Sequence, residues 1–232
     1  AVGLIPSGSK DPLALRRAGQ GIVRILWDQG WGGHLKASCF QSVEGVGAKA
    51  TKGRDETLQA LESFFQDRVA YQLELAGYAG SVRRSALAAG WSDLQDLKAR
   101  CEALSKFAED PRFASLAQSA KRIGNILKDE QPSDAFEVAT FQQAEEKVLA
   151  EELTSIEGLL DATDGKASGV GLHDLAFGRL LDLLAELAEP LEAFFTAVMV
   201  KCEDDKLRAA RLSLLHRLRQ AFLRVADFSQ WQ

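Results

Sequence analysis

The sequence predicts an all-α protein, a helical bundle, on three observations. Apolar residues recur at intervals of three and four along nearly the whole chain. Alternating β-branched runs of the kind that form strands are almost absent. The periodic stretches are separated by short segments that contain Gly, Pro or an Asp or Ser suited to capping a helix. Short separations are typical of helices that pack beside their neighbours in the sequence.

The first helix is expected to begin with Asp11 as its N-cap and Pro12 at its first position, where the missing N–H of proline costs nothing. It should run to about Trp27 and bury one apolar side, with Arg17 and Arg24 projecting from the other. The predicted apolar side consists of Leu15, Ala18, Ile22, Ile25 and Leu26. An irregular linker is predicted for residues 29–54, which hold six glycines and a weak apolar pattern.

The rest of the chain is predicted to form two groups of helices. They are expected at residues 55–76, 79–89, 92–106, 111–128, 133–160, 172–188, 190–201 and 206–226, with a loop at 161–171. The linker places the domain boundary, so that residues 1–54 and 55–232 form separate parts.

Composition favours a soluble intracellular protein. The chain has 46% hydrophobic and 26% charged residues, and it has no apolar run of the ~18 residues needed to cross a bilayer. Three cysteines lie far apart with no CxxC spacing, which fits neither a zinc site nor a disulfide framework. Because the first residues, AVGLIPSGSK, lack a Met and the pattern of a signal peptide, we expect the chain to be part of a longer protein.

Charge is spread unevenly around a net value of −5. Residues 1–54 hold eight Lys and Arg against three Asp and Glu, and residues 131–192 hold fourteen acidic residues against three basic ones. From Lys206 to Arg224 there are six basic residues and no acidic residue. Such a distribution can form one positive surface on an acidic protein.

Motifs for catalysis or metal binding are absent. None of the three histidines has a second ligand at a metal-binding spacing, so no metal site is expected. We interpret His173-Asp174 as a capping or surface pair, although HD is also a token of metal-dependent phosphohydrolases. The carboxylate pairs Glu145-Glu146 and Glu151-Glu152 are interpreted as a solvated helix face rather than an acid/base pair. No glycine-rich phosphate-binding loop or catalytic residue is predicted.

Two basic stretches are candidate RNA contacts. In SAKRIGNILKD, Lys121 and Asn125 lie one helical turn apart and beside Arg122, away from the apolar side. A cation and an amide so placed could hold a phosphate and a base edge, although an ordinary solvated face explains them equally well.

The second stretch is residues 206–228. Its predicted apolar stripe is Leu207, Leu214, Leu218, Ala221, Phe222 and Val225. Arg211 falls within this stripe and should be enclosed, where it needs a carboxylate or several carbonyls as partners. For Arg211 a structural role and an RNA contact stay open, whereas Arg208 lies at the edge of the stripe and is better placed to reach a partner.

Five stretches in this order resemble one family. They are PSGSKDPLALRRAGQGIVRIL (6–26), FFQDRVAYQLELAGY (64–78), AKRIGNILK (120–128), PLEAFFTAVMV (190–200) and LRAARLSLL followed by ADFS (207–229). Together they resemble the C-terminal part of the beta subunit of the heterotetrameric, bacterial-type glycyl-tRNA synthetase. Leu13 and Ala210 depart from the family pattern, which usually has Phe and Asn at these positions.

The resemblance implies a fold and a function. Residues 1–54 would be the C-terminal remnant of an HD-like helical domain and a linker, and residues 55–232 an all-helical anticodon-binding domain similar to the DALR domains of arginyl-tRNA synthetase. The chain would be the non-catalytic, tRNA-binding part of a glycine–tRNA ligase. Its tRNA-binding residues would be Lys121, Arg122, Asn125, Arg208 and Arg211.

The resemblance also implies partners. These are tRNA(Gly) and the alpha subunit of an α2β2 enzyme, with no DNA and no membrane. ATP and Mg would be used by the alpha subunit, with no cofactor in this chain. The implied location is the cytoplasm, or the plastid stroma if the parent is an organellar fusion. Two other classes stay open: a helical scaffold that docks a protein on its acidic segment, residues 131–192, and a hydrolase built on His173-Asp174.

Overall fold

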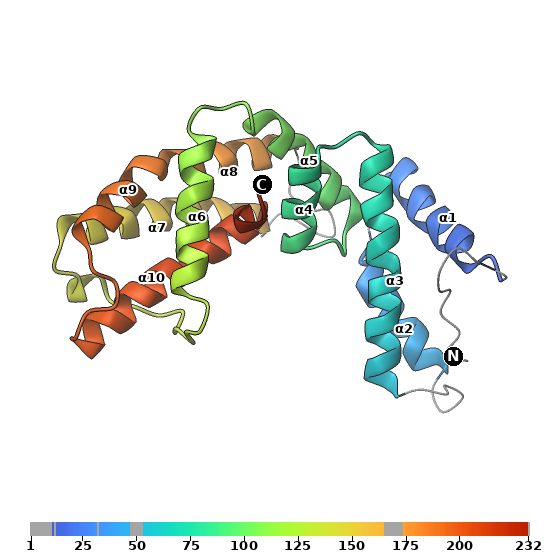
Figure 1. Cartoon of the computed structure of the whole chain (residues 1–232), viewed down its shortest axis with the longest axis horizontal. Helices are drawn as coiled ribbons and strands as arrows, with labels where there is room; N and C mark the ends of the chain where they lie inside the picture. The colour runs from blue at the N-terminus through green and yellow to red at the C-terminus, as the bar shows by residue number, and fades with distance from the viewer. Residues whose placement is uncertain (1–10, 12, 32, 47–52, 165–173, 232) are drawn as a thin grey trace.

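The computed structural model describes residues 11, 13–31, 33–46, 53–164 and 174–231. Over these residues the chain is helical, and its only β-type pairing is one isolated bridge between His34 and Asp93. The all-α prediction is therefore confirmed. Figure 1 shows α1 to α3 at one end, α6 to α10 at the other, and α4 and α5 between them.

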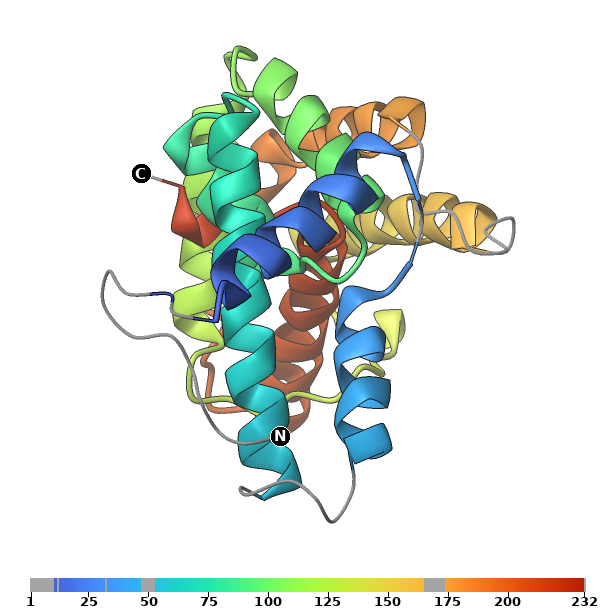
Figure 2. The same cartoon turned by 90° about the vertical axis from the view of Figure 1, so that its right-hand side faces the viewer.

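The N-terminal end is built on one long helix. Helix α3 (Arg54–Leu75) is contacted by α1 (Leu15–Asp28) along one half and by α2 (Leu35–Val46) along the other. Figure 2 shows α1 crossing α3 obliquely, with α2 beside the lower part of α3. Helix α3 therefore joins the two preceding helices to the rest of the chain.

Helix α1 begins later than predicted and buries a different side. It starts at Leu15 because Ala14 has a left-handed backbone with φ of 53°. Asp11 nevertheless serves the helix start, since its Oδ2 accepts a hydrogen bond from the Arg16 backbone N–H at 3.1 Å. Pro12, the predicted first position, lies outside the described residues.

The buried residues of α1 are Gly19, Val23 and Trp27, whereas Ile22 and Ile25 are exposed. The reason is a close approach to α3, because a Cβ atom on Gly19 would lie 2.6 Å from Phe64 Cε1. Because only a glycine allows this contact, the side of α1 that carries Gly19 faces α3, and the side that carries Ile22 and Ile25 does not. The predicted exposure of Arg17 and Arg24 is confirmed.

The predicted linker at residues 29–54 is partly wrong, because it contains α2. Leu35, Cys39 and Val43 recur every four residues and are buried, which gives this short helix one apolar stripe. This three-residue apolar pattern was hard to recognise in the sequence, because Gly45 lies within the helix and other glycines flank it. The division of the chain after residue 54 stays a prediction, because α3 contacts α1 and α2 on one side and α4 on the other.

The centre of the molecule is held by a buried arginine. Helices α4 (Gly80–Ala89) and α5 (Leu94–Phe107) pack together, and α5 carries Arg100. The Arg100 guanidinium donates to the backbone oxygens of Ala86 at 2.8 Å, Gly90 at 2.6 Å and Val225 at 3.1 Å. Its Nε donates to Asp96 at 2.7 Å. These partners satisfy the buried charge and tie α4 and α5 to the chain beyond α10.

The C-terminal end contains five helices around one apolar core. They are α6 (Phe113–Ile126), α7 (Ala144–Asp164), α8 (Asp174–Glu186), α9 (Ala188–Ala197) and α10 (Asp205–Leu223), with short 3₁₀ turns η2 (Val138–Thr140) and η3 (Phe228–Gln230). Every residue of the stripe predicted for α10 is buried, which confirms that prediction.

The helix predicted from residue 133 begins only at Ala144. The Glu146 carboxylate fixes this start, because its Oε2 accepts from the backbone N–H groups of Gln142 at 2.9 Å and Gln143 at 2.7 Å. Residues 130–143 therefore form an extended segment with one 3₁₀ turn that runs past α10.

Candidate RNA-binding surface

Helix α6 presents the first predicted site residues to solvent. Lys121 and Asn125 are exposed and one turn apart. Arg122 is also exposed, and its guanidinium lies 4.2 Å from the centre of the Phe195 ring on α9 and donates to the Phe195 backbone oxygen at 3.4 Å. The structure thus keeps Lys121, Arg122 and Asn125 exposed within about one turn of α6, and Arg122 also contacts α9.

The connection between α9 and α10 is held by two arginines of α10. Arg208 Nη1 donates to the Cys202 backbone oxygen at 3.0 Å, and Arg211 Nη1 donates to the Met199 backbone oxygen at 2.9 Å. Lys201 in this connection pairs with Glu130, beyond the end of α6, at 2.7 Å. The connection therefore spans from α10 to α6, and it leaves the Met199 side chain 75% exposed.

Arg211 is enclosed, as predicted, and pairs with Glu146 of α7. Arg211 Nε lies 2.5 Å from Glu146 Oε1, with side-chain exposures of 6% and 0%. The prediction of a solvated face is wrong for Glu146, because α7 turns this residue toward α10. Burial alone raises the pKa of Glu146, but hydrogen bonds from Arg211, Gln143 and Gln142 together hold the pKa below its ordinary value.

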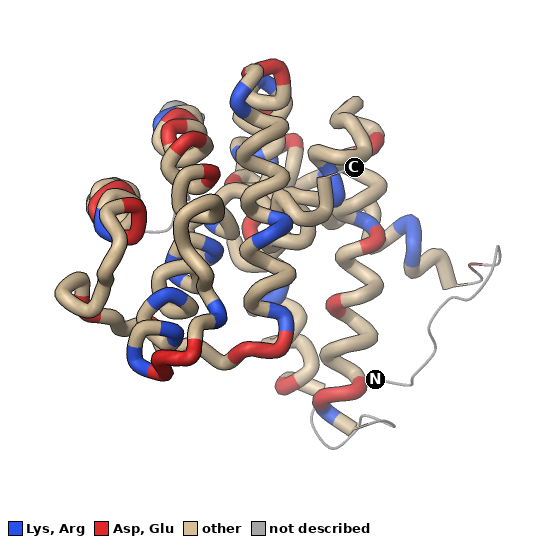
Figure 3. The backbone as a smooth tube through the Cα atoms, turned by 60° about the vertical axis from the view of Figure 1, so that its left-hand side comes forward, with Lys and Arg blue, Asp and Glu red and all other residues tan. Residues whose placement is uncertain are grey.

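Much of the basic run in α10 is neutralised. Arg208 pairs with Asp205 at 2.6 Å, and Arg217 forms a two-point ion pair with Glu157 of α7. With Arg211 also paired, the run does not present six uncompensated charges. Figure 3 shows basic and acidic positions interspersed along the tube. Lys206 is exposed and makes no ion pair with any other residue of the described ranges.

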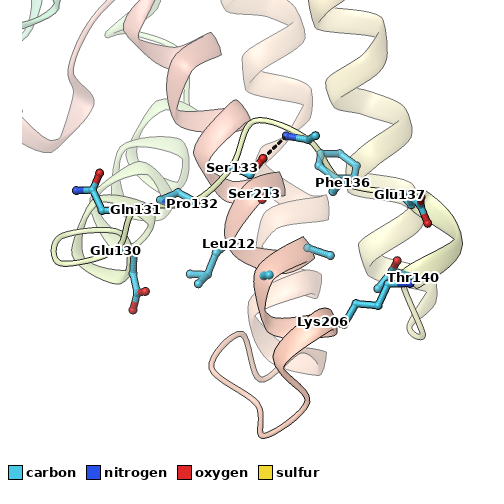
Figure 4. Close-up of a pocket in the computed structure, with 13 residues that line it drawn as sticks. Glu130, Gln131, Pro132, Ser133, Phe136, Glu137, Thr140, Lys206, Leu212 and Ser213 are labelled. Atoms are coloured by element: carbon cyan, nitrogen blue, oxygen red, sulfur yellow. Dashed lines mark hydrogen bonds between the residues drawn. The ribbon is translucent and has the colours of Figure 1, made fainter.

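A hollow lies between α10 and the segment 130–140, and we call it the α10 hollow. Its volume is about 480 Å³. In Figure 4, Glu137, Thr140 and Lys206 lie at one end, and Glu130, Gln131 and Pro132 lie at the other. The wall also includes Ser133, Ala135, Phe136, Ala209, Ala210, Leu212 and Ser213.

The arrangement is suited to binding a nucleic acid. Exposed cations and amides contact phosphates and base edges, and hollows lined by polar groups and aromatic rings accept bases. No cluster of three or more His, Cys, Asp or Glu that could hold a metal occurs among the described residues. His173 of the HD dipeptide lies outside those residues. No helix in the described part of the chain is long and apolar enough to span a membrane.

Phe195 and the α10 hollow were not found from the sequence. Phe194 and Phe195 are adjacent on α9, and only Phe194 is fully buried. Consecutive helical residues point about 100° apart, and in α9 this turn leaves the Phe195 side chain only partly buried. This pair was a signal that one ring is available to a neighbour such as Arg122.

Comparisons with known proteins agree with this geometry. Residues 1–88 match a family model described as "Glycyl-tRNA synthetase beta subunit", and residues 116–225, which include all five predicted site residues, match one described as "DALR anticodon binding domain". The chain belongs to the glycyl-tRNA synthetase beta-subunit family. This confirms the resemblance that was seen in the sequence.

Relatives in this family are similar along the whole chain. The glycine–tRNA ligase beta subunits of Desulfatibacillum aliphaticivorans and Geobacter metallireducens are 38% and 36% identical, each over 99% of this chain. That of Escherichia coli is 36% identical over 100% of this chain. The chain spans only 32% of the length of each of these three relatives.

Proposed function

We propose that this chain is the tRNA-binding part of a glycine–tRNA ligase beta subunit and that α6 and α10 contact the anticodon arm of tRNA(Gly). The observation that carries the proposal is the match of residues 116–225 to an anticodon-binding domain, since these residues contain all the predicted site residues. A helical protein scaffold is not favoured by this match.

The site residues take different roles in this proposal. Lys121 and Arg122 neutralise phosphates, and Asn125 contacts a base edge beside them. Arg208 holds the α9–α10 connection and reaches the RNA from there with its partly exposed side chain. Arg211 is buried, so it acts by positioning α10 and Met199 rather than by touching RNA.

The same proposal assigns the remaining functions to the parent enzyme. Attachment of glycine, with ATP and Mg, takes place on the alpha subunit of an α2β2 assembly in the cytoplasm. This chain then supplies no catalytic residue and no cofactor. It supports the reaction by holding tRNA(Gly) in place, because oriented binding lowers the entropic cost of the chemical step.

The test is a titration of tRNA(Gly) against the wild type and Lys121→Ala at two salt concentrations. Neutralising one phosphate contributes about 0.7 to 0.9 to the slope of log affinity against log salt, so the variant should bind more weakly and lose about that much slope. Lys106→Ala on α5 is the matched control, because Lys106 is also an exposed helical lysine. Equal slopes for Lys121→Ala and the wild type would remove Lys121 from the site.

Specificity is tested with Asn125→Ala. This variant should reduce the preference for tRNA(Gly) over an unrelated tRNA by about one order of magnitude, because a lost base contact costs roughly 1–3 kcal/mol. Wild-type protein that binds neither tRNA at low salt would contradict the proposed function as a whole.

A further inference from the structure

The α10 hollow has the size and lining of a site for one nucleobase. Its volume of about 480 Å³ falls in the range typical of small-molecule pockets, roughly 300–1,000 Å³. Its floor is formed partly by Ala209 and Ala210, whose small side chains leave room above α10. Phe136 adds an aromatic ring to the wall, and such rings are the surfaces on which unstacked bases lie.

Charge decides which part of a nucleotide enters. Glu130 and Glu137 both line the hollow, and Glu137 makes no ion pair with another residue of the described segments. Because Glu130 is neutralised by Lys201, Glu137 is the carboxylate that disfavours a phosphate inside the hollow by like-charge repulsion. Lys206 is exposed beside Thr140 at the end where Glu137 lies, and it can hold a phosphate at the rim (Figure 4). The geometry therefore favours a base inside and its phosphate outside.

Hydrogen-bonding capacity decides which bases fit. The polar side chains of the wall are rich in acceptors: the carboxylate of Glu137 accepts only, and the hydroxyls of Thr140 and Ser213 accept as well as donate. One hydroxyl is already used, since Ser133 Oγ accepts from the Ala135 backbone N–H at 3.1 Å. An exocyclic amino group, as on cytosine, donates to a carboxylate, whereas uracil presents a carbonyl at the same position.

We propose that the α10 hollow takes up one unstacked nucleobase of the bound RNA and that Glu137 selects a base with an exocyclic amino group. Glu137 is a specificity-determining residue in this proposal, and Lys206 holds the phosphate of the same nucleotide. The proposal rests on the proposed function, because it adds a base-reading site to the proposed tRNA-binding part of the beta subunit.

The experiment compares fluorescent oligocytidylate and oligouridylate of equal length by anisotropy. The two probes match in size and charge and differ in the group at the base edge. The wild type should bind oligocytidylate about tenfold more tightly, as expected for one hydrogen bond to a charged group. Glu137→Gln should bring this ratio close to one, because the amide can donate to the uracil carbonyl.

Two further variants serve as controls. Glu151→Gln on α7 makes the same change in net charge at an exposed position outside the hollow and should leave the ratio unchanged. Ala209→Leu fills the hollow from an exposed helical position and should weaken both probes, whereas Ala88→Leu, at an exposed alanine on α4, should weaken neither. Circular dichroism verifies that each variant is folded.

The outcomes separate this proposal from the proposed function. A wild-type ratio near one, or a ratio that Glu137→Gln leaves intact, overturns base selection by the hollow. If tRNA(Gly) binds through Lys121 while Ala209→Leu leaves both probes unaffected, the function stands and the hollow is not the base site. If the wild type binds neither tRNA(Gly) nor the oligonucleotides, the proposed function fails first.

Discussion

Replacing Arg211 with alanine tests how the C-terminal end of the molecule is held together. Arg211 of α10 joins Glu146 of α7 to the backbone oxygen of Met199. The Arg211→Ala substitution leaves Glu146 buried with only the N–H groups of Gln142 and Gln143 as partners. One carboxylate oxygen and one backbone oxygen then lose their donor, and a buried negative charge loses its counter-charge.

The expected loss of unfolding free energy is about 3–5 kcal/mol, the range for breaking a buried pair by removing one partner. Arg217→Ala is the matched comparison, because Arg217 is on the same helix and also pairs with a glutamate of α7. Its pair with Glu157 is about 30% exposed on each side, and its guanidinium lies 4.8 Å from the Phe136 ring. We expect a loss of only about 1 kcal/mol from this exposed pair and ring contact.

The measurement is urea unfolding followed by circular dichroism, with the wild type and both variants at neutral pH. Arg211→Ala should shift the midpoint several times further than Arg217→Ala, with similar slopes. A loss below about 1 kcal/mol for Arg211→Ala would refute the reasoning, since it would mean that Glu146 finds water or another donor easily. Equal losses for the two variants would refute the role of burial.

Three further predictions follow from the ionisable groups. The folded pKa of Glu146 is depressed, so its contribution to stability is complete above the unfolded pKa of ~4.3 and is lost as the pH falls through the lower folded pKa. Glu146→Gln should therefore remove the loss of stability that the wild type shows in this pH range, as measured by acid unfolding. Hydrogen bonds from Arg112 lower the pKa of Asp110 to about 2, and an NMR titration of Arg112→Ala should show that pKa rising toward ~3.9. Burial raises the pKa of Cys101 to about 12. At mildly alkaline pH iodoacetamide should therefore alkylate the partly exposed Cys202, and it should alkylate Cys101 only after unfolding. Equal alkylation rates of Cys101 and Cys202 in the folded protein would contradict this.

The long helices could be predicted from the sequence because their apolar patterns extend over several turns. The α10 stripe is the clearest case, since it repeats over five turns and even places Arg211 inside the core. Short patterns failed, as in α2, where three residues carry the signal. The buried side of α1 also failed, because it depends on how closely Gly19 approaches Phe64, and helix periodicity contains no information about that distance.

The candidate site was predictable only in part for a similar reason. Exposure of Lys121 and Asn125 follows from their position relative to the apolar side of α6. The α10 hollow does not follow, because its wall comes from residues 130–140, which were expected to be partly helical. The start of α7 depends on Glu146, the third residue of the helix, which accepts from the backbone N–H groups just before it. Its ion pair with Arg211 of α10 is a tertiary contact that helix periodicity does not contain.

Arg100 lies between the two family-model matches, residues 1–88 and 116–225, and its guanidinium donates to a backbone oxygen near the end of each, those of Ala86 and Val225. A single nitrogen, Nη1, donates to both Ala86 and Val225 and so joins the two segments directly. The Asp227 N–H adds a second tie, to the Ser85 oxygen at 2.9 Å. These bonds fix the segment that follows α10 to α4, so the C-terminal end cannot move relative to α4 unless they break.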